Sequence, residues 1–454
     1  MHGGVAIILS TLALAATATA QDSCFSGSSS LGDRRALATL RTAIDTHCPC
    51  ASSIGALGRR HYMNCVRAQI TAALQATTLR PECADNARAL YIGATCGTNR
   101  VTCAKPATAD AGASCRLAAP TGHNACGGSD AAELACNAQT QCADVIDATA
   151  GTCIDPRQPG PYGVGVRTVH LVKDSVTAPG TDRVLDTIVW YPTAPDSGMV
   201  DPMLKGVVGA PLDNSGGPYP LLMFSHGSCG YPNQSTFLTP LIASYGFVVA
   251  APPHPGNTLS DFPTCMSAQS LATSALERPA DIAYAADQLL AANADQSSPF
   301  FGSSDPQRMG MSGHSFGGFT TYVVVDHDPR YKVAVALAPA VPGNAKLNLP
   351  SLSMLSELDT YVNDDAIRAV YATAATPKVE VEVLNAGHFA YSDGCFPSPD
   401  CNPPTTLIQD EAHALVQRWV VPFVLRYLKG ATRFDPLLDA VPPGVVVEQD
   451  RGGS

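Results

Sequence analysis

The sequence predicts an α/β fold with a mostly parallel central sheet, preceded by a small, disulfide-rich and partly helical module. From about residue 160 onward, strand-like and helix-like runs alternate, which is typical of a parallel sheet covered by helices on both faces. Twelve of the 16 cysteines lie between Cys24 and Cys153, so the first third of the chain forms a different kind of folding unit. A glycine-flanked serine, Ser315, follows one of the strand-like runs, where a strand is expected to turn sharply into a helix.

The predicted strands are short apolar runs of the length that buried strands have. They lie at residues 164–173, 184–191, 221–225, 247–251, 309–312, 333–337, 352–355 and 379–384. Apolar residues recur at helical spacing at 282–292 and 411–428. Active sites in such sheets form at the carboxyl ends of the strands, so catalytic residues are expected there.

The chain divides into five predicted parts. They are a secretory signal at 1–20, a cysteine-rich module at 24–155, a proline-rich linker at 156–161, a catalytic domain at 162–430 and a C-terminal tail at 431–454. The signal is read from an apolar stretch at 5–14 followed by the small residues Ala18, Thr19 and Ala20. No Lys or Arg precedes that stretch, so an uncleaved anchor is the alternative. The signal and the even number of cysteines predict a secreted, periplasmic or cell-surface protein.

Charge and cysteine spacing restrict the partners of the protein. The chain carries 28 basic and 39 acidic residues, for a net charge of −11, and no basic run. This argues against nucleic acid and anionic membrane surfaces as partners. Helical spacing at 31–44 and 62–79 accompanies the cysteines of the module, whose side chains are expected to form disulfides. A metal site is the weaker alternative, because the cysteines do not form paired C-x-x-C knuckles and His47 and His123 have no regular ligand spacing.

Ser315 is the candidate nucleophile. It is the centre of Gly313-His314-Ser315-Phe316-Gly317, and the two glycines keep side chains away from the crowded turn between strand and helix. A serine at such a turn is raised above the end of the sheet, where a substrate reaches it. The run therefore predicts acyl transfer by a serine enzyme.

Acyl transfer by serine requires a base and a carboxylate that orients the base. On this type of sheet the chain order is serine, acid, histidine. Asp359 follows the predicted strand at 352–355, and His388 follows the strand at 379–384. The sequence therefore predicts Ser315, Asp359 and His388 as the catalytic residues. Glu357 is the rival acid, since the end of its strand cannot be fixed from sequence.

An oxyanion hole is also required, and two backbone N–H groups are expected to form it. The residue after the nucleophile, Phe316, supplies one of them. The glycine-rich loop after the strand at 221–225 supplies the other, with Ser228 as the expected donor to within one position. His226 and His314 are interpreted as buried structural residues beside the nucleophile and not as a second base.

Several short motifs together resemble the α/β-hydrolase superfamily over residues 160 to 430. They are Pro161-Tyr162-Gly163-Val164-Gly165, Val189-Trp190-Tyr191-Pro192, Phe224-Ser225-His226-Gly227, Ala250-Ala251-Pro252-Pro253-His254-Pro255-Gly256, Arg278-Pro279-Ala280-Asp281-Ile282 and Gly313-His314-Ser315-Phe316-Gly317-Gly318. The chain is similar to the group that contains platelet-activating-factor acetylhydrolases, predicted dienelactone hydrolases and polyester hydrolases. The resemblance implies a carboxylic-ester hydrolase that needs no cofactor.

The chain departs from two members of that group. The acetylhydrolases place their acid after the strand that follows the nucleophile, where this chain has Leu337-Ala338-Pro339-Ala340. The acid here is therefore expected to be Asp359. Dienelactone hydrolases proper use a cysteine nucleophile, and this chain has Ser315.

The four cysteines of the catalytic domain are expected to pair as Cys229 with Cys265 and Cys395 with Cys401, next to the catalytic loops. Two functions follow from the whole sequence. The first is a secreted, lipase-like serine esterase that acts on an ester substrate, in which the cysteine-rich module binds a surface or polymer. The second is a binding or adhesion protein that uses a hydrolase scaffold without catalysis.

Overall fold

The computed structural model describes residues 58–85, 87–88, 101–105, 114–118, 132–134, 156–157 and 159–452, with gaps at 195–196, 395–406, 432–433, 440 and 442–443, and scattered positions between 33 and 48. The predicted signal at 1–20 and the predicted pair of Cys395 with Cys401 lie outside the described residues.

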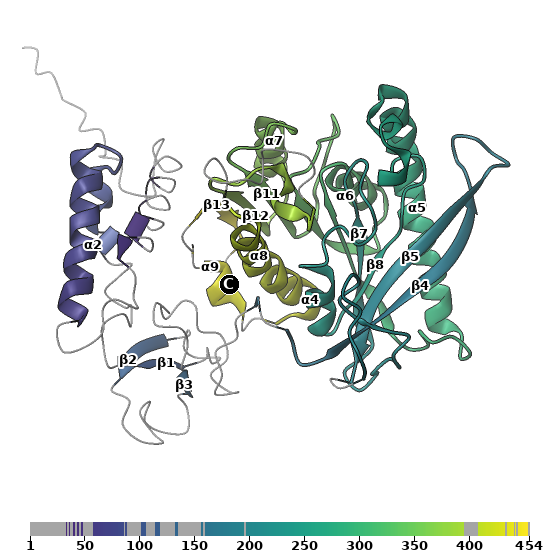
Figure 1. Ribbon diagram of the computed structural model, residues 1–454, viewed down its shortest axis with the longest axis horizontal. Coiled ribbons are helices and arrows are strands. Elements are labelled where there is room, and N and C mark those ends of the chain that lie inside the picture. Colours follow the sequence, from purple (N-terminus) through teal and green to yellow (C-terminus); the bar gives the residue numbers. More distant parts are fainter. Residues whose placement is uncertain are drawn as a thin grey trace, which may run out of the picture.

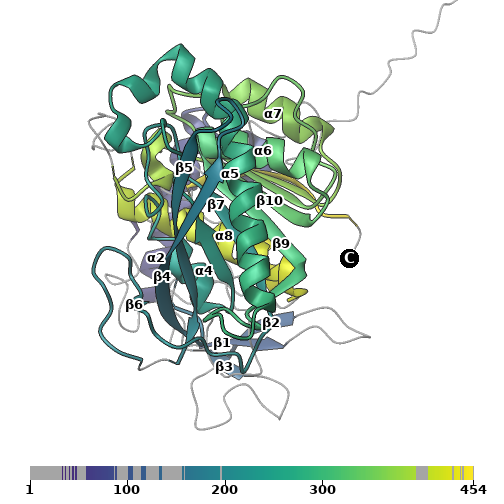
Figure 2. The same cartoon turned by 90° about the vertical axis from the view of Figure 1, so that its right-hand side faces the viewer.

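A ten-stranded sheet forms the centre of the part of the chain after residue 160. Figures 1 and 2 show this sheet between helices. Its order is β13-β12-β11-β10-β9-β7-β8-β5-β4-β6. The strands are β4 (Gly163–Asp174), β5 (Asp182–Thr193), β6 (Val207–Val208), β7 (Tyr219–Ser225), β8 (Val248–Ala251), β9 (Ser304–His314), β10 (Tyr331–Leu337), β11 (Ser351–Ser356), β12 (Lys378–Val383) and β13 (Val445–Asp450). The six strands from β8 across to β12 are parallel to their neighbours, which confirms the predicted mostly parallel sheet.

Helices cover both faces of this sheet. One face packs against α4 (Thr239–Ser244), α8 (Gln409–Lys429) and α9 (Asp435–Asp439), and the other against α5 (Ala268–Ala294), α6 (Phe316–His327) and α7 (Asp364–Thr373). Alternate residues of β7 separate the two cores, because Leu222 and Phe224 lie in the first and Leu221 and Met223 in the second. This alternation along a fully buried strand explains why β7 reads as a continuous apolar run.

The sheet extends beyond residue 430, the boundary expected from sequence. Residues 431–454 were expected to be a tail, but β13 pairs antiparallel with β12 over six residue pairs. Val445, Val446 and Val447 are buried in this pairing. The chain therefore continues past α8 to add an edge strand. Only the first three residues of β13 are apolar, and so short a run carries no local sign of the strand that it will pair with, which is why the sequence did not predict this element.

The amino-terminal part has a small core of its own. Helix α2 (Gly58–Gln75) buries Tyr62, Val66 and Ile70 at helical spacing. Cys48 and Cys65 form a disulfide in this core. A short 3₁₀ turn, η2 (Pro81–Cys83), follows α2. A separate antiparallel sheet, which the sequence did not predict, consists of β1 (Val101–Lys105), β2 (Ser114–Ala118) and β3 (Ala132–Leu134). A disulfide-rich, partly helical unit thus precedes the hydrolase fold, as predicted.

Backbone hydrogen bonds attach the end of the linker to the catalytic part. The N–H of Tyr162 donates to the Ser244 carbonyl at 3.0 Å, and the N–H of Gly160 donates to Ser244 Oγ at 2.8 Å. A Cβ atom at position 160 would lie 2.4 Å from the Ser244 carbonyl oxygen, so only glycine allows this approach. These hydrogen bonds join the chain to the unit of the large sheet from residue 160 onward.

Candidate active site

The turn that carries Ser315 joins β9 to α6. Ser315 has φ 58° and ψ −116°, a conformation that non-glycine residues adopt rarely and that is found where function requires it. A Cβ atom at Gly313 would lie 2.2 Å from the Gly317 carbonyl oxygen, and one at Gly317 would lie 1.8 Å from the Ser225 carbonyl oxygen. Both flanking positions must therefore be glycine for the turn to form.

Ser315, His388 and Asp359 form one hydrogen-bonded chain. His388 Nε2 lies 2.8 Å from Ser315 Oγ, and His388 Nδ1 lies 2.7 Å from Asp359 Oδ2. A carboxylate only accepts hydrogen bonds, so Nδ1 carries the proton and Nε2 is free to accept the serine proton. His388 opens the 3₁₀ turn η7 (His388–Tyr391) after β12, and Asp359 follows β11. The structure brings together the three residues that the sequence singled out.

The loop around Asp359 separates it from Glu357. Asp359 Oδ1 accepts hydrogen bonds from the N–H groups of Tyr361, at 2.7 Å, and Val362, at 3.3 Å, which leaves Oδ2 for His388. The exposed Glu357 accepts instead from the N–H of Asn385 at 2.9 Å. The Tyr361 ring stacks on the His388 imidazole at 4.9 Å between centroids. The Glu357 carboxylate thus forms its hydrogen bond with Asn385 and not with His388.

The loop after β7 passes beside the serine. A Cβ atom at Gly227 would lie 3.4 Å from Ser315 Cβ, so Ser228, the next residue, is close to Ser315. Phe316 is the first residue of α6. Within the described part of the chain, neither the Phe316 N–H nor the Ser228 N–H donates to a protein group. Both predicted oxyanion-hole donors therefore remain available to a ligand.

A disulfide fixes this loop. Cys229 is bonded to Cys265, the pair expected from sequence, and Cys265 lies in the short turn η6 (Thr264–Met266). The preceding turn, η5 (Leu259–Asp261), is linked to the same loop by a hydrogen bond from the Leu259 N–H to the Gly230 carbonyl at 2.9 Å. Two connections thus hold the loop that carries Ser228.

Three buried histidines near the site are neutral. Burial lowers the pKa of His226, His254 and His314 well below the ordinary value, and nearby positive or imidazole groups lower it further. His314 is hydrogen-bonded to the His388 carbonyl at 2.9 Å and to Gln234 Nε2 at 3.0 Å. Like His226, it lies in the packed shell around Ser315 and His388.

Sequence reasoning missed the side chains that support the loop of residues 226–229. Gln234 Oε1 accepts the Gly227 N–H at 2.9 Å, and Asn257 Nδ2 donates to Ser228 Oγ at 3.0 Å. Arg278, on α5, donates to the carbonyls of His226 and Gly227. A signal existed for Arg278: with Glu277 and Asp281 it places three charges in a helix of low charge, and a buried charge must have partners.

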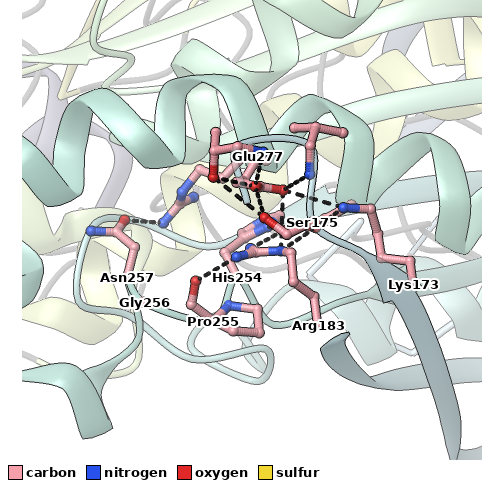
Figure 3. Close-up of polar contacts among 12 residues, drawn as sticks. Lys173, Ser175, Arg183, His254, Pro255, Gly256, Asn257 and Glu277 are labelled. Carbon is pink, nitrogen blue, oxygen red and sulfur yellow. Dashed lines mark hydrogen bonds and ion pairs between the residues drawn. The ribbon is translucent and has the colours of Figure 1, made fainter. Parts of the chain in front are cut away.

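Figure 3 shows a cluster of polar contacts that includes Lys173, Arg183, His254 and Glu277. Lys173 Nζ lies 3.2 Å from Glu277 and 3.3 Å from Asp281, and Arg183 lies 2.7 Å from Asp281. His254 bridges Asp281, at 3.0 Å, to Ser225 Oγ, at 2.9 Å. These contacts join β4, β5, β7 and α5 beneath the active-site loops.

The described residues contain no group of three or more histidine, cysteine or acidic side chains arranged to hold a metal ion. None of their helices combines the length and apolar character needed to span a membrane.

The chain is similar to several known proteins. A family model described as "PETase: PET hydrolase-like" matches residues 205–442, which is more than half of the chain. The bis(hydroxyethyl) terephthalate hydrolase of Streptomyces coelicolor is 25% identical over 257 residues, covering 54% of this chain and 70% of that protein. Cutinase est1 of Thermobifida alba is 28% identical over 190 residues, 41% of this chain and 58% of that protein, so less than two thirds of the cutinase is matched.

The fold has solved relatives. The structure of a ferulic acid esterase from Streptomyces cinnamoneus superimposes with a TM-score of 0.53 at 23% identity, covering 64% of this chain and 98% of the other. At 23% identity, this similarity is evidence for the fold alone. Taken with the family match, it leads to one conclusion: the chain belongs to the PET hydrolase-like family of carboxylic-ester hydrolases, with the α/β-hydrolase fold.

Proposed function

We propose that this protein hydrolyses carboxylic esters with Ser315 as the nucleophile, His388 as the general base and acid, and Asp359 as the residue that orients His388. The single observation that carries this proposal is the continuous chain of hydrogen bonds from Ser315 Oγ through His388 to Asp359, at 2.8 Å and 2.7 Å. Such a chain, on a strained turn at the end of a parallel sheet, has the geometry that nucleophilic serine requires.

In the first half of the reaction, Ser315 Oγ attacks the carbonyl carbon of the ester while His388 Nε2 takes the hydroxyl proton. The carbonyl oxygen becomes negatively charged in the tetrahedral intermediate. The imidazolium formed is stabilised by the Asp359 carboxylate, whose own hydrogen bonds from Tyr361 and Val362 keep it in place. His388 then gives its Nε2 proton to the leaving alcohol oxygen, and an acyl-serine remains.

In the second half, a water molecule attacks the acyl carbon and gives a proton to His388 Nε2. The second tetrahedral intermediate collapses, Ser315 Oγ recovers the proton and the carboxylic acid leaves. In both halves the N–H groups of Phe316 and Ser228 are the proposed donors to the oxyanion. Their lack of protein partners in the described residues supports this role.

The substrate class that we propose is an apolar or aromatic ester, polyesters included. The Met266 sulfur lies 3.8 Å from Ser228 Oγ and the side chain of Met266 is 53% exposed. On the other side, Tyr361 stacks on His388 and is 54% exposed. Exposed apolar side chains on both sides of a catalytic serine favour contact with an apolar substrate. The names of the related bis(hydroxyethyl) terephthalate hydrolase and cutinase also favour an ester substrate of this class.

Export and surface attachment complete the proposal. The disulfides Cys48–Cys65 and Cys229–Cys265 support an oxidising compartment outside the cytosol. The sequence features at 1–20 support a secretory signal. We assign residues 24–155 as an attachment module for a surface or polymer, because the proposed catalytic residues all lie after the linker.

A series of p-nitrophenyl esters of increasing acyl length, together with bis(hydroxyethyl) terephthalate, tests the proposed activity. We expect saturable hydrolysis by the wild type, and a fall of at least ~10⁴-fold in kcat for Ser315→Ala, which retains the Cβ atom and fits the same turn. Turnover by Ser315→Ala within about tenfold of the wild type would exclude Ser315 as nucleophile. A wild type without hydrolysis of any ester would favour the alternative, a binding protein on a hydrolase scaffold.

A further inference from the structure

Arg278 is a fully buried arginine directly beneath the proposed oxyanion hole. Its side chain is 0% exposed, and its guanidinium donates to the His226 carbonyl at 2.6 Å, the Gly227 carbonyl at 3.0 Å and Asn257 Oδ1 at 2.6 Å. A longer contact of 3.4 Å reaches Ser225 Oγ. The guanidinium carbon also lies 4.7 Å from the centre of the Phe316 ring. Arg278 thus contacts both the loop that carries Ser228 and the side chain of Phe316, the two residues whose N–H groups are the proposed oxyanion-hole donors.

The contact with Gly227 fixes the direction of the Ser228 N–H. The Gly227 carbonyl and the Ser228 N–H belong to the same planar peptide group, in which a trans bond points the two in opposite directions. Arg278 holds the carbonyl oxygen from one side, and the Nδ1–H of His226 donates to the same oxygen at 2.7 Å. The Gly230 N–H also donates to this oxygen, at 3.1 Å, so the peptide cannot rotate without losing three hydrogen bonds. Donation to a carbonyl also polarises the peptide and strengthens its N–H as a donor.

Asn257 connects Arg278 to the rest of the loop. It is 0% exposed, accepts from Arg278 through Oδ1, and donates through Nδ2 to Ser228 Oγ at 3.0 Å and to the Cys265 carbonyl at 2.7 Å. The loop around Ser228 is therefore held by a charged group through both its backbone and its side chain.

Arg278 also leaves the buried cluster with a positive charge. The cluster contains the cations Lys173, Arg183 and Arg278 and the carboxylates Glu277 and Asp281. Lys173 and Arg183 lie within 3.3 Å of both carboxylates, whereas among the described residues no carboxylate lies within 4.0 Å of Arg278. Burial lowers the pKa of Arg278 to about 9, which leaves it charged at neutral pH. Its partners are loop carbonyls, so its charge is directed toward the site where the oxyanion forms.

We infer that Arg278 is a positioning residue for the oxyanion hole: it orients the peptide between Gly227 and Ser228 and places an unpaired positive charge behind the developing negative charge. This inference rests on the proposed serine mechanism and adds a residue to it. Interactions that strengthen only in the transition state lower kcat when they are lost and leave substrate binding almost unchanged. A residue with only a packing role would instead lower the amount or stability of the folded protein.

The test compares Arg278→Met with Lys173→Met in the full-length protein. Both variants remove a cation from the same buried cluster, but the polar contacts of Lys173 within the described structure go to Glu277 and Asp281 and not to the loop that carries Ser228. For p-nitrophenyl butyrate we expect Arg278→Met to lower kcat by roughly 10²-fold, as for the loss of an oxyanion-hole donor, with KM within about threefold. Lys173→Met is expected to keep kcat within a few fold. Far-UV circular dichroism and a melting curve establish that each variant is folded.

A transition-state mimic provides a second readout. Phenylboronic acid forms a tetrahedral adduct with a nucleophilic serine. The alcohol product of ester hydrolysis binds without forming a tetrahedral adduct. We expect the inhibition constant of the boronic acid to rise in Arg278→Met in proportion to the fall in kcat/KM, and that of the alcohol to stay within about twofold. If Arg278→Met does not fold, Arg278→Lys is measured in the same way, with an expected loss of about tenfold because the charge stays but the two-carbonyl contact is lost.

The inference is overturned if the folded Arg278 variant matches Lys173→Met in kcat, or if boronic acid and alcohol lose affinity equally. That outcome leaves the proposed function in place, since the wild type would still be active and Ser315→Ala inactive. An inactive wild type, or an active Ser315→Ala, would instead overturn the proposed function together with this inference.

Discussion

Asp359 Oδ2 lies 2.7 Å from Nδ1 of His388, and the two side chains are 0% and 4% exposed. Glu357, only two residues earlier, points elsewhere and accepts from the Asn385 N–H. Strand β11 ends at Ser356, so the loop that follows it decides which carboxylate reaches the histidine. The roles of Asp359 and Glu357 can therefore be compared directly by substituting each of them.

Asp359→Asn is expected to lower kcat by up to ~10⁴-fold, because an amide favours the tautomer of His388 in which Nε2 carries the proton and cannot act as base. Glu357→Gln is the matched control and is expected to stay within a few fold of the wild type. Steady-state kinetics on p-nitrophenyl butyrate measures both. A nearly silent Asp359→Asn together with an impaired Glu357→Gln would reverse the assignment of the acid.

Glu380→Gln is expected to raise stability at alkaline pH. Glu380 lies in β12, 5% exposed and opposite Glu448 of β13, and within the described residues its Oε2 has no hydrogen-bond partner. Burial, with help from Glu448 and Glu382 and against Arg368, raises the pKa of Glu380 from 4.5 to about 7. The folded state therefore holds the proton more tightly than the unfolded state, and the stability that this provides is present below pH 4.5 and lost as pH rises through 7.

The measurement is urea unfolding at pH 4 and pH 8. At pH 8 we expect Glu380→Gln to have a free energy of unfolding higher than the wild type by up to roughly 3 kcal/mol, and the difference to vanish at pH 4. Glu411→Gln, at an exposed position of α8, is expected to change neither value. Equal effects of the two variants at pH 8 would show that Glu380 ionises normally in the folded protein.

Removal of the Cys229–Cys265 disulfide is expected to affect both stability and activity. The bond closes a loop with a sequence separation of 36 residues, for which loop-closure entropy predicts a loss of about 3 to 4 kcal/mol. The double variant Cys229→Ala with Cys265→Ala should also lower kcat, because the loop that carries Ser228 loses one of its anchors. Thermal unfolding and ester kinetics are the measurements.

The Cys48–Cys65 disulfide offers the matched control. Its double variant to alanine removes a bond of the amino-terminal core, which is remote in sequence from every proposed catalytic residue. We expect kcat on small esters to be unchanged in that variant. A fall in kcat equal to that of the Cys229 and Cys265 variant would mean that the loss is a general effect of destabilisation.

A protein that begins at residue 156 is expected to fold and to hydrolyse small esters with kcat/KM within a few fold of the full-length protein. It retains Gly160 and Tyr162, whose N–H groups bond to Ser244. If residues 24–155 attach the enzyme to a polymer, turnover of an insoluble polyester should fall by ~10² through the loss of effective concentration. A folded truncated protein that is inactive on small esters would show that the module completes the active site.

The sequence by itself determined the elements whose chemistry is local. Glycines at 313 and 317 identify the turn around Ser315 because backbone crowding there excludes any side chain. Continuous apolar runs identify the parallel strands because both faces of those strands are buried. Each of the eight predicted strands overlaps an observed strand of the sheet, and His388 and Asp359 lie just beyond the ends of β12 and β11.

The tertiary structure decided what depends on partners far away in the sequence. Strand β13 has only three apolar residues, and its partner, β12, lies more than 60 residues earlier, so no local pattern assigns it to the sheet. Arg278 stood in one of the motifs that carry the family resemblance, but no role for it followed from the sequence. Its contacts with the carbonyls of His226 and Gly227 exist because α5 packs beneath the loop after β7. Burial of a charge depends on which surfaces come together in space, and a linear sequence does not specify them.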